Sequence, residues 1–215
     1  MYKLFYAPGS AAMAPHAVLE EIGAPHELVL VNLEKKAHQR PEYLKLNPKG
    51  RVPVLVDRDF VLTEAAAIMM YLADAHPEAK LAPALGTRER AQWYQWLLYL
   101  SNTLQPAFLE YFYPERSFPD APNTQQQLKA SAVRRLTGML IYIDSELAAR
   151  GPYLLGETFS AADIFLHMLA RWSRWFDKPA YRYIHIKQLT DRVRARPAVQ
   201  RMMKAQGIVE QEKAP

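Results

Sequence analysis

The sequence predicts two domains, a small α/β domain with a mixed four-stranded sheet followed by an all-helical domain. Short apolar strands alternate with helical patterns over the first eighty residues, and later patterns are helical almost throughout. Half of the 215 residues are hydrophobic, which suffices for two small domains with sizeable cores. Pro77, Pro83 and Gly86, in the stretch PEAKLAPALGT, predict a linker at residues 78–87 between residues 1–77 and residues 88–215.

Four apolar runs are expected to form the strands of the first domain, at residues 2–6, 26–33, 52–56 and 60–62. The last two flank Asp-Arg-Asp, which is typical of a hairpin. Helices are expected between these strands and after them, at residues 12–23, 40–50 (short or irregular) and 63–76. This order favours a mixed sheet over a doubly wound one. PGSAAM contains a single glycine and therefore does not match the glycine-rich fingerprint of dinucleotide-binding folds.

The second domain is expected to contain long helices. Apolar residues at three- and four-residue spacing predict one helix from Trp93 to Phe108, which Pro106 should kink. Another is expected over residues 124–151. A third follows Ser160 with a capping box, in which the Ser160 hydroxyl and the Asp163 carboxylate each accept a hydrogen bond from the other residue's amide.

Composition excludes several kinds of chemistry. The chain has no cysteine, which removes disulfides, thiolate nucleophiles, thiolate zinc sites and iron–sulfur clusters. Its six histidines show no metal-ligand spacing, so no metal site is expected, and packing is the favoured role for His16. No apolar stretch suits a signal peptide or a membrane span, which predicts a cytoplasmic protein without a membrane partner.

The net charge is +5, and arginines concentrate late in the chain. A nucleic-acid-associated protein is one hypothesis, and a steep salt dependence of binding would identify it. No recognised nucleic-acid motif accompanies the charge, so a solvated helix face is favoured and no nucleic-acid partner is expected.

A tight turn from strand to helix provides the first candidate site. Residues 6–16, YAPGSAAMAPH, follow the first strand with Pro-Gly and three small residues. Because proline is tolerated only in a first helical turn, Pro15 indicates a helix that begins near Ala11 or Ala12. The amides of Ala11 and Ala12 would then point at whatever lies in front of the turn, with Ser10 beside them.

Two further stretches suit a peptide-like ligand. If the Val52–Pro53 bond is cis, the Val52 backbone could pair with a ligand as an extra strand; an ordinary strand-start proline is the alternative. At the next strand-to-helix turn, the amides would favour a carboxylate and Glu64 could accept from an ammonium group; a capping glutamate is the alternative. Together the three stretches describe a site for a carboxylate, an amine and a peptide backbone, as in glutathione.

With these residues in view, the chain resembles the cytosolic glutathione transferases, most of all the bacterial beta-class group and its relatives. The resemblance covers nearly the whole chain, through YKLFYAPGSAAMAPH, LNPKGRVPVLV, LTEAAAIMMYLAD and YLLGETFSAADIFL. It implies a thioredoxin-like first domain and a homodimeric enzyme of detoxification. The glutathione thiolate would react with an apolar electrophilic small molecule, with glutathione as a co-substrate and no cofactor.

The resemblance also implies roles for particular residues. Val52 would precede a cis Pro53 and bind the cysteinyl backbone of glutathione, and Glu64 and Ala65 would bind its γ-glutamyl end. Lys36 or Lys35 would lie near its glycyl carboxylate. The second substrate would lie against the kinked helix, in an apolar pocket for which the candidates are Gln105, Phe108, Tyr111, Phe112, Tyr113 and Trp172.

The chain departs from the beta-class pattern at the corner that faces the sulfur. Ala11 stands where that class has a cysteine, and Ala12 where a serine often follows. Gln105 replaces a histidine important in some members, and Ala65 stands where many members have a serine. Mixed-disulfide chemistry is therefore excluded, and activation of the glutathione thiol becomes the open question.

Two hydroxyls are candidates for stabilising a thiolate. Lowering a thiol pKa by about two units from about 8.5 requires roughly 2.7 kcal/mol. One hydrogen bond to a charged group contributes about 1.5–3 kcal/mol, and a helix N-terminus adds about 0.3–1 kcal/mol. We favour Ser10, assisted by the amides of Ala11 and Ala12, over Tyr6, which ends the first strand where tyrosine-dependent classes carry their catalytic residue.

A non-catalytic module that binds a ligand or a partner protein is the alternative to an enzyme. The missing cysteine and serine favour the module, whereas the retained Ser10, Glu64 and Val-Pro pair favour catalysis.

Overall fold

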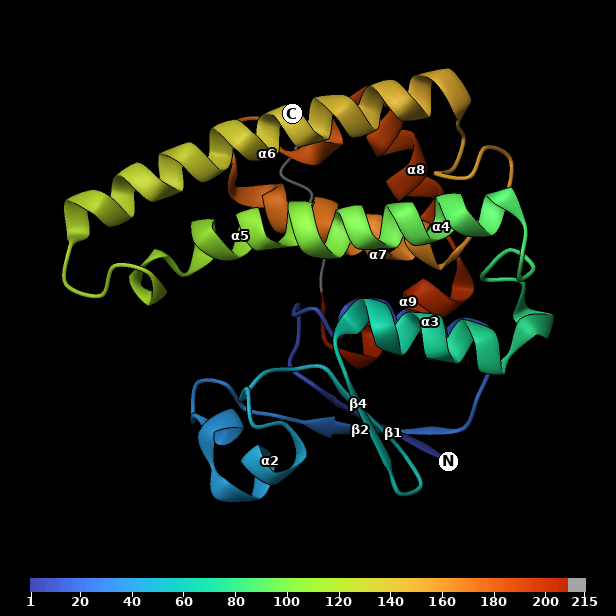
Figure 1. The fold of residues 1–215 in the computed structure, drawn as a ribbon, viewed down its shortest axis with the longest axis horizontal. Coiled ribbons are helices and arrows are strands. Elements are labelled where there is room, and N and C mark those ends of the chain that lie inside the picture. The colour runs from blue at the N-terminus through green and yellow to red at the C-terminus, as the bar shows by residue number, and fades with distance from the viewer. Residues whose placement is uncertain (209–215) are drawn as a thin grey trace. The chain divides into compact units, whose positions relative to one another are not determined.

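The computed structural model describes residues 1–208 and divides the chain into two compact units (Figure 1). The first contains Met1–Ala82 together with the segment from Arg194 onward, and the second contains Pro83–Val193. The last helix therefore groups with the first unit, whereas residues 88–215 were expected to form one helical domain. Residues 209–215 of that expected domain lie outside the described residues.

The first unit is built on the predicted four-stranded mixed sheet, and the structure gives its strand order as β2-β1-β3-β4. β1 (Tyr2–Tyr6) pairs in parallel with β2 (His26–Leu30) and antiparallel with β3 (Val54–Asp57). β3 forms the expected hairpin with β4 (Phe60–Thr63) through a two-residue turn. Arg58 in that turn has a φ of 57°, in the left-handed region that tight hairpin turns use.

Helices flank this sheet on both faces (Figure 1). Phe5 and Val54 are direct cross-strand partners, so their side chains lie on the same face of the sheet, where they pack with Tyr43 of α2 (Pro41–Leu46). Side chains alternate along each strand, so the neighbouring pair of Leu4 and Leu55 lies on the other face. Leu4 and Leu55 are completely buried on the other face, on which α1 (Met13–Ile22) and α3 (Ala65–Ala75) pack side by side. The N-termini of α1 and α3, where predicted site residues lie, belong to this helical layer.

α9 (Pro197–Ala205) packs along α1, and their side chains explain part of the late basic charge. Arg196 forms two bonds to the Glu21 carboxylate, of 2.5 and 2.9 Å. Arg201 Nε lies 2.6 Å from Glu20 Oε2. These arginines neutralise the acids of α1, and Val199 and Met202 fill the core beneath them. This packing is the reason that α9 belongs to the first unit.

The second unit is helical throughout, with α4 (Arg88–Tyr99), α5 (Gln105–Phe112), α6 (Pro122–Arg150), α7 (Ala161–Trp172) and α8 (Ile184–Arg194). α5 runs beside α6 (Figure 1). A π-helical turn, Leu100–Leu104, continues α4 into α5 without a break, because Leu100 and Leu104 at the two junctions both have right-handed helical dihedral angles. The expected long helix is therefore present, and Pro106 directly follows its irregular turn.

The capping box of α7 is present as predicted. Every residue of α7 from Ala161 to Ala170 is buried, so this helix forms the core of the second unit. Among the described residues, no helix combines the length and the hydropathy that a bilayer crossing requires.

Candidate functional site

The strand register brings the predicted glutathione-binding stretches to one end of the sheet. Phe5 pairs with Val54, and Val54 pairs with Thr63, so the end of β1 lies beside the start of β3 and the end of β4. β2 runs parallel to β1 and therefore ends on the same side. The turn after β1, the proline before β3, the N-terminus of α3 and the lysine-bearing loop after β2 all leave the sheet at this end.

Ser10 closes the turn between β1 and α1 with its own hydroxyl. Ser10 Oγ donates to the Ala7 carbonyl oxygen at 2.7 Å and accepts from the Ala12 amide at 3.2 Å. α1 begins at Met13, slightly later than expected, because the Met13 amide still bonds to the Ser10 carbonyl. The Ser10 hydroxyl proton is thus engaged, and it must leave the Ala7 carbonyl before it can bond to a thiolate.

The backbone amides of Ala11 and Ala12 in this turn differ in their availability to a ligand. The Ala11 amide makes no hydrogen bond to any residue between 1 and 208, and its position before α1 suits an anion. The Ala12 amide is already bonded to Ser10. Tyr6 is half-buried, with its ring centroid 6.4 Å from that of His16 on α1.

The Val52–Pro53 bond is cis, in agreement with what the resemblance implied. Two side chains hold the carbonyl that precedes it. Tyr43 Oη donates to the Arg51 carbonyl oxygen at 2.7 Å, and Asn47 Nδ2 donates to the same atom at 2.8 Å. Sequence reasoning missed both residues: Tyr43 lies outside the motifs that carry the resemblance, and Asn47, within LNPKGRVPVLV, was given no role. Burial raises the pKa of Tyr43 well above its ordinary value, so its phenol stays a donor.

Glu64 precedes α3 with a positive φ of 68°, which is costly for a residue with a Cβ. Its carboxylate is exposed and lies 2.5 Å from Lys49 Nζ. Ala65 is buried directly behind it at the start of the helix. The predicted acceptor for an ammonium group is therefore already occupied by the Lys49 ammonium group, and Lys49 is a third residue that sequence reasoning missed.

The loop after β2 carries the two lysines expected near a glycyl carboxylate. Lys36 adopts a φ of 52°, and Asn32 Oδ1 accepts a hydrogen bond of 2.9 Å from the Lys35 amide. Both lysine side chains are exposed. This turn follows β2, so both lysines lie at the same end of the sheet as the other predicted binding stretches.

The residues expected around the second substrate form an aromatic cluster within the second unit. Phe108 and Trp172 meet edge to face, with ring centroids 5.9 Å apart, and Phe112 contacts both rings. Phe108 is completely buried and Trp172 nearly so, whereas Tyr113 is 38% exposed. Gln105 opens α5 and is half-buried. Tyr111, Phe112 and Tyr113 thus remain more accessible to a ligand than Phe108.

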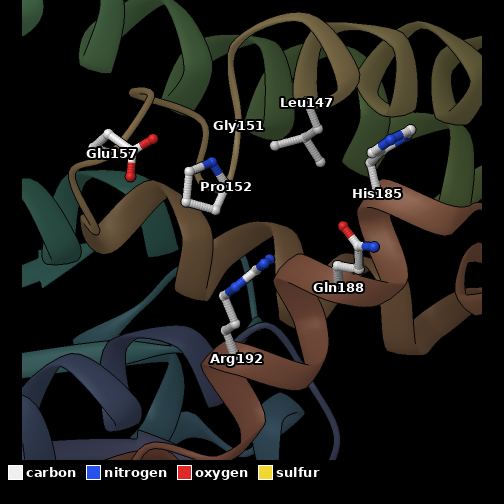
Figure 2. A pocket seen from close by; sticks show the side chains of 7 residues that line it. All are labelled: Leu147, Gly151, Pro152, Glu157, His185, Gln188 and Arg192. Carbon is white, nitrogen blue, oxygen red and sulfur yellow. The ribbon is translucent and has the colours of Figure 1, made fainter.

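A separate depression of about 390 Å³ lies in the second unit (Figure 2). Figure 2 shows Arg192, Gln188 and His185 projecting from α8 toward Leu147 of α6 and the loop after it. None of the residues that line this depression was expected to bind glutathione or the second substrate.

His16 is the titratable group of α1 that lies nearest the turn. Its side chain is completely buried, and burial, with a smaller effect from His26, lowers its pKa to about 4. His16 is therefore uncharged at neutral pH. Gln206 links it to the turn, because Gln206 Nε2 lies 3.1 Å from His16 Nδ1 and Gln206 Oε1 accepts from the Gly9 amide at 3.3 Å.

Comparison with known proteins agrees with this arrangement. The family model of the glutathione S-transferase N-terminal domain matches residues 1–74, and that of the C-terminal domain matches residues 99–197. Glutathione S-transferase GstA of Escherichia coli O157:H7 is 33% identical over 208 residues, which cover 96% of this chain and 99% of the relative. The chain belongs to the glutathione S-transferase family.

Solved structures place this glutathione S-transferase family member among bacterial relatives. A sphingomonad glutathione S-transferase complexed with glutathione is 35% identical with a TM-score of 0.84, over 96% of this chain and 100% of that one. The beta-class enzyme of Sphingomonas chungbukensis is 32% identical with the same TM-score and the same coverage. The resemblance to the beta-class group is confirmed, and so are the thioredoxin-like and helical parts of the fold.

Proposed function

We propose that this protein is a glutathione transferase that joins the glutathione thiolate to an apolar electrophilic small molecule. The observation that carries the proposal is the common end of the sheet at which the four predicted binding stretches emerge. The glutathione bound to the sphingomonad relative supports glutathione as the co-substrate.

The spacing of the strands suits a tripeptide. Neighbouring strands lie about 4.8 Å apart, so the span from β1 through β3 to β4 is about 10 Å. Three extended residues reach about 10 Å, which would let glutathione run from the turn after β1 to Glu64. Val52 and Pro53, at the start of β3, would then face its cysteinyl backbone. Ala65 and Glu64 would receive its γ-glutamyl end, and Lys36 its glycyl carboxylate.

The sulfur would lie at the turn before α1. The Ala11 amide offers a donor there, and the Ser10 hydroxyl offers a second one if it turns from the Ala7 carbonyl. A hydrogen bond to a charged group contributes about 1.5–3 kcal/mol, whereas the neutral bond given up contributes about 0.5–1.5 kcal/mol. Exchanging the hydrogen bond to the Ala7 carbonyl for one to the thiolate therefore still gains free energy, and we prefer Ser10 over Tyr6 for this role.

Family membership supports two further assignments. A homodimer is the expected assembly, and the cytoplasm the expected location. The half-buried and exposed aromatic residues of α5 and Tyr113 suit an apolar second substrate better than the buried Phe108 does.

Calorimetry with glutathione, combined with the ultraviolet thiolate absorbance of the complex between pH 5 and pH 10, tests the function. We expect binding at millimolar glutathione and a bound thiol with a pKa about two units below about 8.5. Absence of binding would refute the transferase assignment. Binding without a lowered thiol pKa would instead identify a non-catalytic glutathione-binding module.

A further inference from the structure

Three potential metal ligands, two on α1 and one at the start of β2, lie close together in the first unit. His16 and Glu20 stand one helical turn apart on α1, and His26 begins β2. The candidate ligand atoms of the three residues all lie within 4.8 Å of one another. Glu20 Oε1 is 3.7 Å from His16 Nε2 and 3.7 Å from His26 Nε2. Sequence spacing did not reveal this cluster, because His26 reaches it from another element.

Two of the three side chains are oriented as metal ligands require. His26 Nδ1 lies 2.8 Å from the Ala24 carbonyl oxygen, which accepts its proton and leaves the lone pair of Nε2 directed at the cluster. Arg201 binds Glu20 Oε2 at 2.6 Å and the Glu20 carbonyl at 2.9 Å, which leaves Oε1 for the histidines. Ligand orientation by such outer hydrogen bonds is characteristic of metal centres.

His16 supplies an independent observation that points to a ligand. Its side chain is completely buried, yet its Nε2 atom has no hydrogen-bond partner within residues 1–208. A buried polar atom without a partner is costly, and this one is aimed at the Glu20 carboxylate beyond hydrogen-bond distance. A cation bonded to both atoms would remove that cost.

We propose that His16, Glu20 and His26 form a binding site for a divalent transition-metal ion of the Zn²⁺ type. Two imidazoles and one carboxylate are a ligand set that zinc accepts, with water in the fourth position. Tetrahedral bonds of about 2.0–2.1 Å place ligand atoms about 3.3 Å apart, so the two 3.7 Å separations must each close by about 0.4 Å. The partly exposed side chains of Glu20 and His26 leave an entry path from solvent.

Metal binding competes with one hydrogen bond of the turn. The Gly9 amide fixes the Gln206 side chain with Oε1 toward Gly9 and Nε2 donating to His16 Nδ1. A metal-bound Nε2 instead requires a proton on Nδ1, which needs an acceptor. The Gln206 side-chain amide must then rotate, which breaks its hydrogen bond with the Gly9 amide. A glutamate at position 206 could accept from Gly9 and from His16 at once.

Isothermal titration of tag-free, chelator-treated full-length protein with ZnCl₂ at pH 7.5 tests the site. We expect one ion per chain, with affinity lowered at least tenfold in Glu20→Gln and in His26→Gln. The matched control is His76→Gln, because His76 and Glu78 form a comparable pair on the surface, 3.2 Å apart; it should change affinity less than twofold. Gln206→Glu should raise affinity about tenfold, within the range known for outer-shell carboxylates.

Cobalt provides a second readout that does not depend on stability. Co²⁺ at the proposed site should give the intense visible absorption of four-coordinate cobalt, and His26→Gln should abolish it while far-UV circular dichroism stays unchanged. Zinc affinity that is equal in the parent protein, Glu20→Gln and His26→Gln would overturn the proposal. So would cobalt spectra typical of the hexaaqua ion. Neither outcome bears on glutathione binding, which is measured separately.

Discussion

The N-terminus of α7 and the N-terminus of α1 both use a serine, but they leave their backbone donors in different states. At α7, Ser160 Oγ accepts from the Ala162 amide, and the Asp163 carboxylate accepts 2.8 Å bonds from the amides of Ser160 and Leu154. At α1, no acid lies in the first turn and Ala12 provides no side-chain cap. The Ala11 amide there makes no hydrogen bond within the described chain.

The difference shows that a serine at the N-terminus of a helix can serve two purposes. The α7 cap is completely buried, so each amide must find a partner within the protein. The α1 turn is only partly buried, so a donor without a partner costs little and is available to a ligand anion. The first cap is therefore expected to act in stability, and the second suits the binding role proposed for it.

The largest expected effect is on stability, at the α7 cap. Asp163→Ala should lower the free energy of unfolding by about 2–5 kcal/mol, because two buried amides lose their acceptor. Urea denaturation followed by circular dichroism measures the change. Asp191→Ala, the same substitution in an exposed pair with Lys187, is the control and should cost less than about 1 kcal/mol. Equal losses in both variants would contradict the assignment of the α7 cap.

The two helices should also respond to pH in opposite directions. Burial raises the pKa of Asp163 to about 6, so the folded chain binds more protons than the unfolded chain between about pH 4 and 6. Its contribution to stability therefore falls as pH rises. Burial lowers the pKa of His16 to about 4, so the unfolded chain binds more protons between about pH 4 and 6.5. That contribution rises with pH.

Single variants should separate these two effects. From pH 4 to 6.5, the stability of the parent protein minus that of Asp163→Asn should fall, and the stability of the parent minus that of His16→Gln should rise. Each change should be on the order of 2–3 kcal/mol. Urea titrations at half-unit steps of pH measure both curves. Parallel slopes in the two curves would show that one of the pKa shifts has the opposite sign.

A smaller effect is expected on catalysis, at the α1 turn. Ser10→Ala should lower kcat/KM about 5–30-fold, corresponding to about 1–2 kcal/mol, since the thiolate bond is partly offset by the bond to Ala7. Turnover with glutathione and an aryl halide, followed by absorbance, measures it. Ser145→Ala is the matched control, because Ser145 Oγ also donates to a backbone carbonyl and should leave turnover unchanged. A greater loss in Tyr6→Phe would assign the role to Tyr6.

The smallest effect is expected at the N-terminus of α3. Lys49→Ala should change the free energy of unfolding by less than about 1 kcal/mol, because its pair with Glu64 is exposed. The same denaturation measurement at 0.15 M and 1 M salt should give nearly equal values for the parent. A loss above 2 kcal/mol would show that Lys49 is a structural cap and is not readily displaced by a ligand ammonium group.

Most local structure could be predicted from the sequence. The hairpin through Arg58 and the capping box of Ser160 and Asp163 depend on residues close together in the chain, and the structure has both. The long helix through Pro106 was predicted, but its π-helical turn was not, because that turn is an adjustment of backbone hydrogen bonding that side-chain spacing does not encode. Ser10, Val52 and Glu64 were chosen from local chemistry and Ala65 and Lys36 from the family resemblance, and the roles of all five stay predictions.

The partners of those residues could not have been found in the same way. Lys49 reaches Glu64 across fifteen positions, and Tyr43 and Asn47 converge on one carbonyl from different parts of a helix and its end. No spacing rule selects such residues, because their contacts depend on how α2 and the following loop fold against the sheet.

By itself, the sequence determined the order of strands and helices, the capped start of α7 and the absence of a cysteine at the sulfur-facing turn. Local backbone preferences and side-chain patterns act over a few residues, so these features are encoded in place. Only the tertiary structure decided that four separated stretches meet at one end of the sheet and that His26 joins His16 and Glu20. Strand register and helix packing set those meetings, because they join residues that the chain itself keeps apart.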